Sequence, residues 1–143
     1  MTGRWKIALA LAALAGATSL GFAGGHAWSA DATGQTLTPL VEQALANIPG
    51  KTLSALTVDY APGGTSPAHH HHASATLFAY VVSGAIRSQV NGGPVEVFRA
   101  GQFWIEPPGS AHGISENASK TEPAKLVVVA IGDDGAVLTT FDK

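Results

Sequence analysis

The sequence predicts an all-β fold of the sandwich or barrel type. From Thr52 onward, apolar and polar residues alternate with a period of two, which is typical of strands with one buried face. These short runs are separated by turn sequences such as Pro62-Gly63-Gly64 and Asn91-Gly92-Gly93. No segment after Pro49 has the length and period of a crossover helix, so we do not expect a parallel α/β sheet.

The first 32 of the 143 residues are expected to form a signal peptide or an N-terminal anchor. Arg4 and Lys6 precede an uncharged stretch from Ile7 to Ala30, whose centre reads IALALAALAGATSLGF. A basic start, an apolar centre and small residues beyond it are the parts of a secretory signal, and cleavage would follow Ala32 or Ala27. We therefore expect export to the periplasm or the extracellular space, with a membrane as partner only if the segment is retained.

Residues 33–50 are predicted to form a short helical lead-in. Thr38-Pro39 supplies a hydroxyl N-cap and a proline at the first turn, and Pro49-Gly50 ends the run. Between them, five apolar residues follow one another at helical spacing: Leu40, Val41, Ala44, Leu45 and Ile48. The stripe suggests that this helix packs against a larger body.

Residues 51–143 are predicted to form the β domain, with seven strands separated by turns. The expected strands are Thr52–Tyr60, Thr76–Val82, Ala85–Val90, Val95–Phe98, Gln102–Glu106, Lys125–Ile131 and Val137–Phe141. Many short, evenly spaced strands of this kind argue for a sandwich or a closed barrel.

Composition and charge exclude several classes of function. With 8 basic and 10 acidic residues, the formal net charge of −2 removes the electrostatic basis for binding nucleic acid. The chain has no cysteine, which excludes disulfides, thiolate zinc sites, a cysteine nucleophile and a lipoprotein anchor.

The histidines point to a metal site. Four of the six are consecutive, His69 to His72, and His112 stands alone just beyond the turn Pro107-Pro108-Gly109. Residues two apart on a strand face the same way, so the run holds two candidate pairs, His69 with His71 and His70 with His72. Three neutral imidazoles at the mouth of a barrel would bind a divalent metal ion.

These residues resemble the two motifs of the cupin family. The second motif reads Gly101-QFWIE-Pro107-Pro108-Gly109-SA-His112-GIS-Glu116, with Glu116 where the family has Asn and Asn117 one position late. The first lies within APGGTSPAHHHH and TLFAYVVSGAI, between Ala61 and Ile86. The resemblance covers Gly63 to Asn117 and implies a double-stranded β-helix, or jelly-roll barrel.

Both registers of the first motif start correctly, from Gly63 to His69 and His71 or from Gly64 to His70 and His72. The lead-in before the run favours His69 and His71, although the other register fits the downstream spacing without an insertion. The glutamate ligand of the family would fall at Thr76 or Leu77, and neither carries a carboxylate. We therefore expect a three-histidine site of His69, His71 and His112 that lacks the anionic ligand.

The resemblance implies one bound divalent metal ion, with iron, manganese, zinc and nickel all acceptable to three imidazoles. Three-histidine cupins of this kind include non-haem iron dioxygenases, so a dioxygenase, decarboxylase or isomerase acting on a small molecule is one interpretation. A non-catalytic barrel that binds or senses a small ligand, with metal optional, is the alternative. A third interpretation is a barrel that only assembles with itself. The exposed sheet edge of a jelly roll gives a reason to expect a homodimer.

No catalytic residue is assigned from the sequence. Glu106 precedes the turn Pro107-Pro108-Gly109, and Glu116 follows His112. Glu106 is most simply interpreted as an outward-facing polar residue on its strand. Arg87 and Gln89 alternate with their neighbours, and period two does not decide which set faces inward. The candidates for core or pocket wall are the aromatic residues Phe78, Tyr80, Phe98, Phe103 and Trp104.

Overall fold

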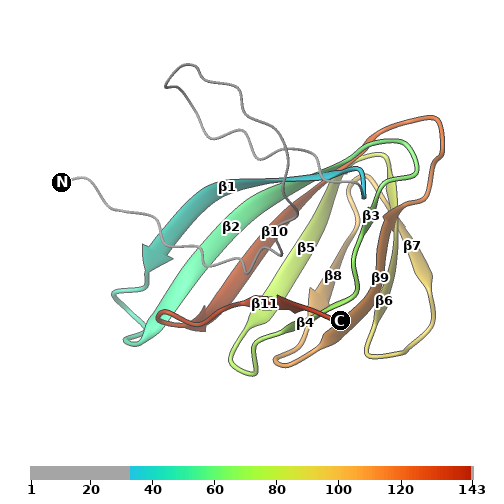
Figure 1. The fold of residues 1–143 in the computed structure, drawn as a ribbon. Helices are drawn as coiled ribbons and strands as arrows, with labels where there is room; N and C mark the ends of the chain where they lie inside the picture. The colour runs from blue at the N-terminus through green and yellow to red at the C-terminus, as the bar shows by residue number, and fades with distance from the viewer. Residues whose placement is uncertain (1–32, 143) are drawn as a thin grey trace, which may run out of the picture.

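A computed structural model describes residues 33–142 as two antiparallel β-sheets folded against each other (Figure 1), which confirms the all-β jelly-roll prediction. One sheet has the strand order β1-β2-β10-β5-β8, and the other has the order β11-β4-β9-β6-β7 with β3 paired to β9. The strands of the first sheet are β1 (Gln35–Ala44), β2 (Lys51–Tyr60), β5 (Thr76–Ser83), β8 (Phe103–Glu106) and β10 (Ala124–Asp133). Those of the second are β3 (Thr65–Ser66), β4 (His69–His71), β6 (Ala85–Val90), β7 (Glu96–Arg99), β9 (Ala111–Asn117) and β11 (Thr139–Phe141).

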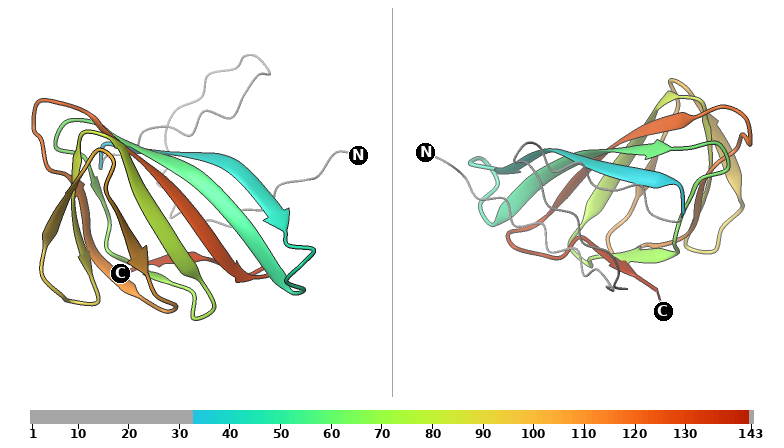
Figure 2. Two further views of the ribbon diagram at one scale, coloured as in Figure 1. Left: turned by 180° about the vertical axis from the view of Figure 1, so that it is seen from behind. Right: turned by 45° about the horizontal axis from the view of Figure 1, so that its top comes forward.

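Each of the seven strands expected from the sequence is present within a few residues of its predicted bounds. The sequence pattern missed four strands, β1, β3, β4 and β9. Two of these, β4 and β9, carry the histidines and lie side by side in the second sheet. Figure 2 shows that the first sheet is a long twisted layer in which β1 and β2 extend past the second sheet.

The predicted helix over residues 33–50 is wrong, because Gln35–Ala44 forms strand β1. This strand pairs antiparallel with β2 from Gln35 opposite Tyr60 to Ala44 opposite Thr52, with a bulge between Pro39 and Val41. Pro39 is tolerated because β1 is an edge strand and the missing N–H falls at the bulge. The backbone pairing along β2 outweighs the helical spacing of the apolar residues.

The core lies between the two sheets and is built from the inward set of each strand. Val81 and Ile86 are fully buried on either side of the β5–β6 turn, and Trp104 packs against them from β8. The buried cluster consists of Val58, Tyr60, Ala79, Val81, Ile86, Trp104, Ala124 and Leu126. A smaller cluster of Ala75, Leu77 and Ala130 continues it along β5 and β10.

The turn between β5 and β6 requires a glycine at position 84. Gly84 has φ of +73°, a conformation that side chains rarely adopt. A Cβ built there would lie 2.7 Å from the Cβ of Ala124 and 2.7 Å from the carbonyl oxygen of Pro123. Gly84 therefore lets the hairpin close directly against the start of β10.

The proposed signal segment lies outside the described residues. Within residues 33–142, no helix is long and apolar enough to span a membrane.

Candidate metal centre

Strands β4 and β9 bring three histidines together. His69 lies directly opposite His112 in the antiparallel register, and His71 is two residues along β4 on the same face. All three are buried, whereas His70 and His72 are exposed. One ring nitrogen of each lies within 4.8 Å of those of the other two. The inward pair is thus His69 and His71, as the motif favoured, and with His112 they are placed to hold a metal ion.

Hydrogen bonds to the outer ring nitrogens orient two of the imidazoles. The Nδ1 of His69 lies 2.8 Å from the carbonyl oxygen of Pro67, and the Nδ1 of His71 lies 3.2 Å from that of Leu138. A carbonyl oxygen only accepts, so the Nδ1 of His69 carries the hydrogen and its Nε2 offers a lone pair to the site. The Nδ1 of His71 also lies 3.2 Å from the hydroxyl of Thr139, and with its hydrogen directed to Leu138 the Nε2 of His71 offers a lone pair as well. The Nε2 of His71 is buried with no hydrogen-bond partner among the described residues. That free lone pair fits a metal ligand.

The third imidazole is held from the other side. The Nε2 of His112 lies 2.9 Å from the hydroxyl of Ser88 on β6, which leaves its Nδ1 facing the cluster. Ser88 is itself buried. Sequence reasoning passed over Ser88, although its place between Arg87 and Gln89 puts it on the opposite face from both.

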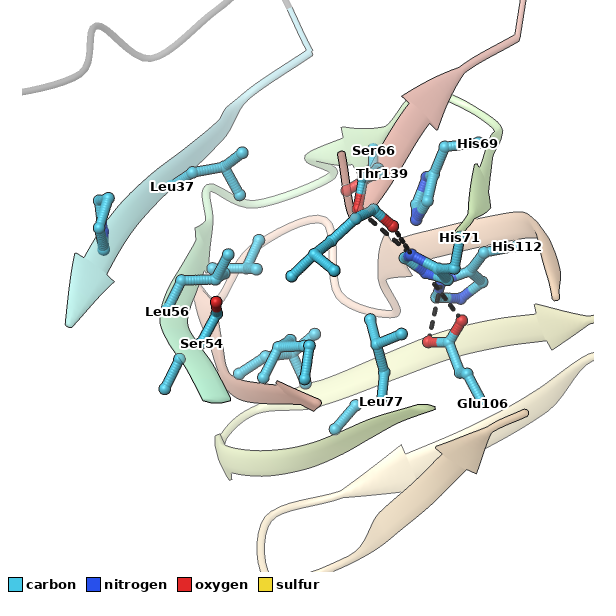
Figure 3. Close-up of a pocket in the computed structure, with 18 of the residues that line it drawn as sticks. Leu37, Ser54, Leu56, Ser66, His69, His71, Leu77, Glu106, His112 and Thr139 are labelled. Carbon is cyan, nitrogen blue, oxygen red and sulfur yellow. Dashed lines mark hydrogen bonds and ion pairs between the residues drawn. The ribbon is translucent and has the colours of Figure 1, made fainter. Parts of the chain in front are cut away.

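Glu106 is the residue that sequence reasoning placed wrongly. It was expected on the outside of its strand, but it is only 2% exposed. Its Oε2 lies 3.0 Å from the Nε2 of His71, and its Oε1 lies 3.2 Å from the Nδ1 of His112 (Figure 3). The indole N–H of Trp104, two residues earlier on the same face of β8, donates to the Oε1 at 3.0 Å. A carboxylate therefore stands beside the three histidines, contrary to the expectation of a site without one.

Burial and mutual contact shift the pKa values of this cluster. Burial lowers the pKa of His112 to about 4, against a partial opposing effect of the Glu106 carboxylate. Burial likewise lowers the pKa of His69. Burial alone would raise the pKa of Glu106, but the neighbouring imidazoles and the Trp104 N–H together hold it below its ordinary value. With His69 and His112 held neutral and Glu106 held ionised, these three groups are in the protonation states that bind a cation.

The other candidates from the sequence lie away from the cluster. Arg87 is exposed and pairs with Glu116 on the neighbouring strand β9. Gln89 is half-buried and donates to the carbonyl oxygen of Gly93. Of the aromatic residues, Trp104 is in the core and Phe98 packs against it with ring centroids 4.7 Å apart.

A cavity of about 220 Å³ leads away from the histidines toward β1 and β2. Figure 3 shows His71, His112 and Glu106 on one side of it and Leu37, Leu56 and Leu77 around the rest. Most of the wall is aliphatic, with residues from β1, β2, β5 and β10 and from the segment that leads into β11. Among residues 33–142, none of those that line it is a lysine or an arginine. The space is suited to a ligand with a mostly apolar body.

A second polar group lines the cavity beside the histidines. The hydroxyl of Tyr60 lies 2.6 Å from that of Ser66 and 2.8 Å from that of Ser115, and the Ser66 hydroxyl donates to the side-chain oxygen of Gln35. Burial raises the pKa of Tyr60, so it stays a neutral phenol. This cluster adds hydroxyl groups to a wall that is otherwise mostly aliphatic.

Comparison with known proteins decides the family. The sequence profile described as "Cupin domain" matches residues 56–130, which span the histidine run and His112. The chain belongs to the cupin family. A search of the curated proteins found no match.

Solved structures of similar shape include other members of this cupin fold. Oxalate oxidase in complex with the substrate analogue glycolate matches with a TM-score of 0.60 and 28% identity, covering 84% of this cupin and 62% of that chain. This cupin therefore spans less than two thirds of the length of that enzyme. KdgF from Halomonas sp. matches at 22% identity, with a TM-score of 0.55 and coverage of 76% and 86%. A double-stranded β-helix protein from Klebsiella pneumoniae matches at 18% identity, with a TM-score of 0.61 and coverage of 84% and 99%.

Proposed function

We propose that the protein is an exported cupin that binds one divalent metal ion through His69, His71 and His112 and takes a small molecule into the adjoining cavity. The observation that carries the proposal is the convergence of three buried imidazoles at one side of a cavity of about 220 Å³. Iron, manganese, zinc and nickel all suit these ligands. A bound ion of this kind supplies Lewis-acid chemistry or activates dioxygen.

The chain's own residues define the ligand class. Because the described lining residues include no lysine or arginine, they offer no basic side chain to pair with a second anionic group of the ligand. The hydroxyls of Tyr60, Ser66 and Ser115 can bind an oxygen atom of the ligand, while the aliphatic wall receives an apolar body. We propose a small molecule with one oxygenated or anionic group and an apolar remainder.

The first candidate is a dioxygenase or a related enzyme that acts on a small molecule. The test uses protein expressed without an added polyhistidine tag, followed by elemental analysis. One metal ion per chain in the wild type and loss of that ion in His112→Ala are expected. Oxygen consumption is then measured with diketones, thiols and flavonols, and with oxalate and glycolate because of the likeness to oxalate oxidase.

A non-catalytic cupin that binds or senses a small ligand is the second candidate. The mostly aliphatic cavity wall favours it, because Glu106 is the acidic side chain in contact with His71 and His112 and most of the remaining wall offers no acid or base. Tight ligand binding without turnover in the metal-loaded protein would select this candidate. A metal content well below one per chain that is unchanged in His112→Ala would overturn the metal site and the enzyme, and would leave only this second candidate, in which metal is optional.

Export is proposed from the N-terminal sequence. When the full chain is expressed in a bacterium, we expect a secreted or periplasmic product whose intact mass shows cleavage after Ala32 or Ala27. An uncleaved chain in the membrane fraction would instead indicate an anchor.

We further propose a homodimer through the outer face of the first sheet. Phe78 and Phe103 contact each other there with ring centroids 5.2 Å apart, and Phe103 and Ile105 are more than half exposed on the edge strand β8. An apolar patch on a sheet edge is a frequent site of self-association. Light scattering of the wild type is expected to give twice the chain mass, and Phe103→Ser is expected to reduce it to one.

A further inference from the structure

The carboxylate of Glu106 has no obvious structural partner for one of its oxygens. Its Oε1 accepts the hydrogen bond of Trp104, but its Oε2 is buried and has no hydrogen-bond partner among residues 33–142. That oxygen lies 3.0 Å from the Nε2 of His71, which is also buried. Two buried polar atoms thus face each other at a distance where either a proton on the Nε2 or a metal ion can lie between them.

The chemistry of these two atoms favours a cation between them. When the Nδ1 of His71 donates to the carbonyl oxygen of Leu138, the Nε2 carries a lone pair, whereas the tautomer that accepts from Thr139 places a hydrogen on the Nε2. A carboxylate oxygen also presents lone pairs, so the two atoms repel each other unless a positive charge lies beside both. Leaving such groups buried and unpaired costs free energy that coordination of a metal ion would recover.

The spacing of the donor atoms agrees with coordination to one ion. Metal–ligand bonds of about 2.1 Å place neighbouring ligand atoms roughly 3.0 to 3.4 Å apart in octahedral or tetrahedral sites. The oxygens of Glu106 lie 3.0 Å from the ring nitrogen of His71 and 3.2 Å from that of His112. The two contacts involve the same ring nitrogens that face the site.

We propose that Glu106 is a metal ligand and supplies from β8 the carboxylate that the first motif lacks at Thr76 and Leu77. The proposal rests on the three-histidine metal site of the proposed function. It changes the charge of that site, because an ion of charge +2 with one carboxylate ligand keeps a net charge of +1. A ligand with a single negative charge would then neutralise the centre, in agreement with a cavity that has no lysine or arginine in its lining.

Trp104 has a defined part in this arrangement. Its indole N–H occupies the Oε1 of Glu106 and so turns the Oε2 toward His71. Such hydrogen bonds to a ligand orient it before the metal binds. Trp104 is therefore a positioning residue, and Glu106 is the ligand.

The test compares metal binding by the wild-type chain, Glu106→Gln and Glu96→Gln, all without an added polyhistidine tag. Glu96 is an exposed carboxylate on β7 and serves as the matched control. Calorimetry with Zn²⁺ is expected to show at least a tenfold loss of affinity in Glu106→Gln and no loss in Glu96→Gln. The tenfold figure is a lower bound, because removing a residue that only orients a metal ligand already lowers metal affinity about tenfold to hundredfold. The absorption spectrum of the Co²⁺ form is expected to change in Glu106→Gln alone, because the spectrum reports the ligand set.

The outcomes separate the two proposals. A wild type that binds metal, together with an unchanged affinity and Co²⁺ spectrum in Glu106→Gln, would overturn the role of Glu106 and leave the three-histidine site standing. A wild type that binds no metal would overturn both. If Glu106→Gln does not fold, a crystal structure of the metal-loaded wild type decides: a Glu106 oxygen about 2.0 to 2.6 Å from the ion supports the proposal, and one beyond 3 Å refutes it.

Discussion

Replacing Trp104 with phenylalanine tests how strongly the indole N–H holds Glu106. The substitution removes a hydrogen bond of 3.0 Å to a buried carboxylate, which is worth about 1.5 to 3 kcal/mol. The smaller ring also leaves a void in the core, at a cost of about 1 kcal/mol. We therefore expect Trp104→Phe to lower the free energy of unfolding of the metal-free protein by about 3 kcal/mol.

A double-mutant cycle isolates the hydrogen bond from the packing. Urea unfolding of the wild type, Trp104→Phe, Glu106→Met and the double variant should give a coupling energy of about 1 to 2 kcal/mol between the two residues, because methionine lacks the oxygen that accepts the indole N–H. Phe98→Leu is the packing control, because its contact with Trp104 is through its ring. Its coupling to Glu106→Met should be near zero. A coupling below about 0.5 kcal/mol for Trp104 and Glu106 would refute the reasoning.

Further predictions concern the turn, the hydroxyl cluster, acid stability and metal loading. Gly84→Ala should lower the free energy of unfolding by about 2 to 4 kcal/mol, measured by urea denaturation, because the added Cβ meets both a positive φ and the backbone of β10. Tyr60→Phe should lower it by about 1 to 2 kcal/mol in the same assay, because the partners at Ser66 and Ser115 lose a buried hydrogen bond. In the metal-free protein, the free energy of unfolding should fall as the pH drops from about 6.5 to about 4, because His112 binds a proton in this range in the unfolded chain but not in the folded one. A free energy of unfolding that stays constant over that range would contradict this assignment. Zn²⁺ at a hundred times its Kd should raise the free energy of unfolding by about 2.7 kcal/mol in the wild type, and His112→Ala should abolish the effect.

Most of the fold was predictable from the sequence because the strands have one buried and one exposed face. The failure at residues 33–50 has a physical reason. Leu40 and Ile48 are exposed on the β1–β2 hairpin, so the helical spacing of the apolar residues does not correspond to one buried face. Leu37, Pro39 and Val41, which are spaced by two, line the cavity instead. In a stretch this short, pairing with β2 decides the structure and local propensity does not.

The histidines of the site were predictable, whereas the carboxylate was not. His69, His71 and His112 stand at motif spacing, and the alternation of exposed and buried residues on β4 then selects one of the two pairs. Glu106 shares its face of β8 with Trp104, and period two links the two residues without telling which face is buried. A charged residue is usually placed outside by default. The signal that could have found it was the large indole two residues earlier, which identifies the inward face.

The run of four histidines also has a consequence for insertions and deletions. A one-residue slip of a strand normally exchanges its inner and outer side chains and destroys a site. Here the slip would replace His69 and His71 with His70 and His72, which carry the same imidazole. A slip in that direction would therefore still deliver two imidazoles to the same side of the sheet, whereas the opposite slip would bring in Ala68 and His70 and deliver only one. The repeated residue makes this part of the protein tolerant of a kind of sequence change that most binding sites do not survive.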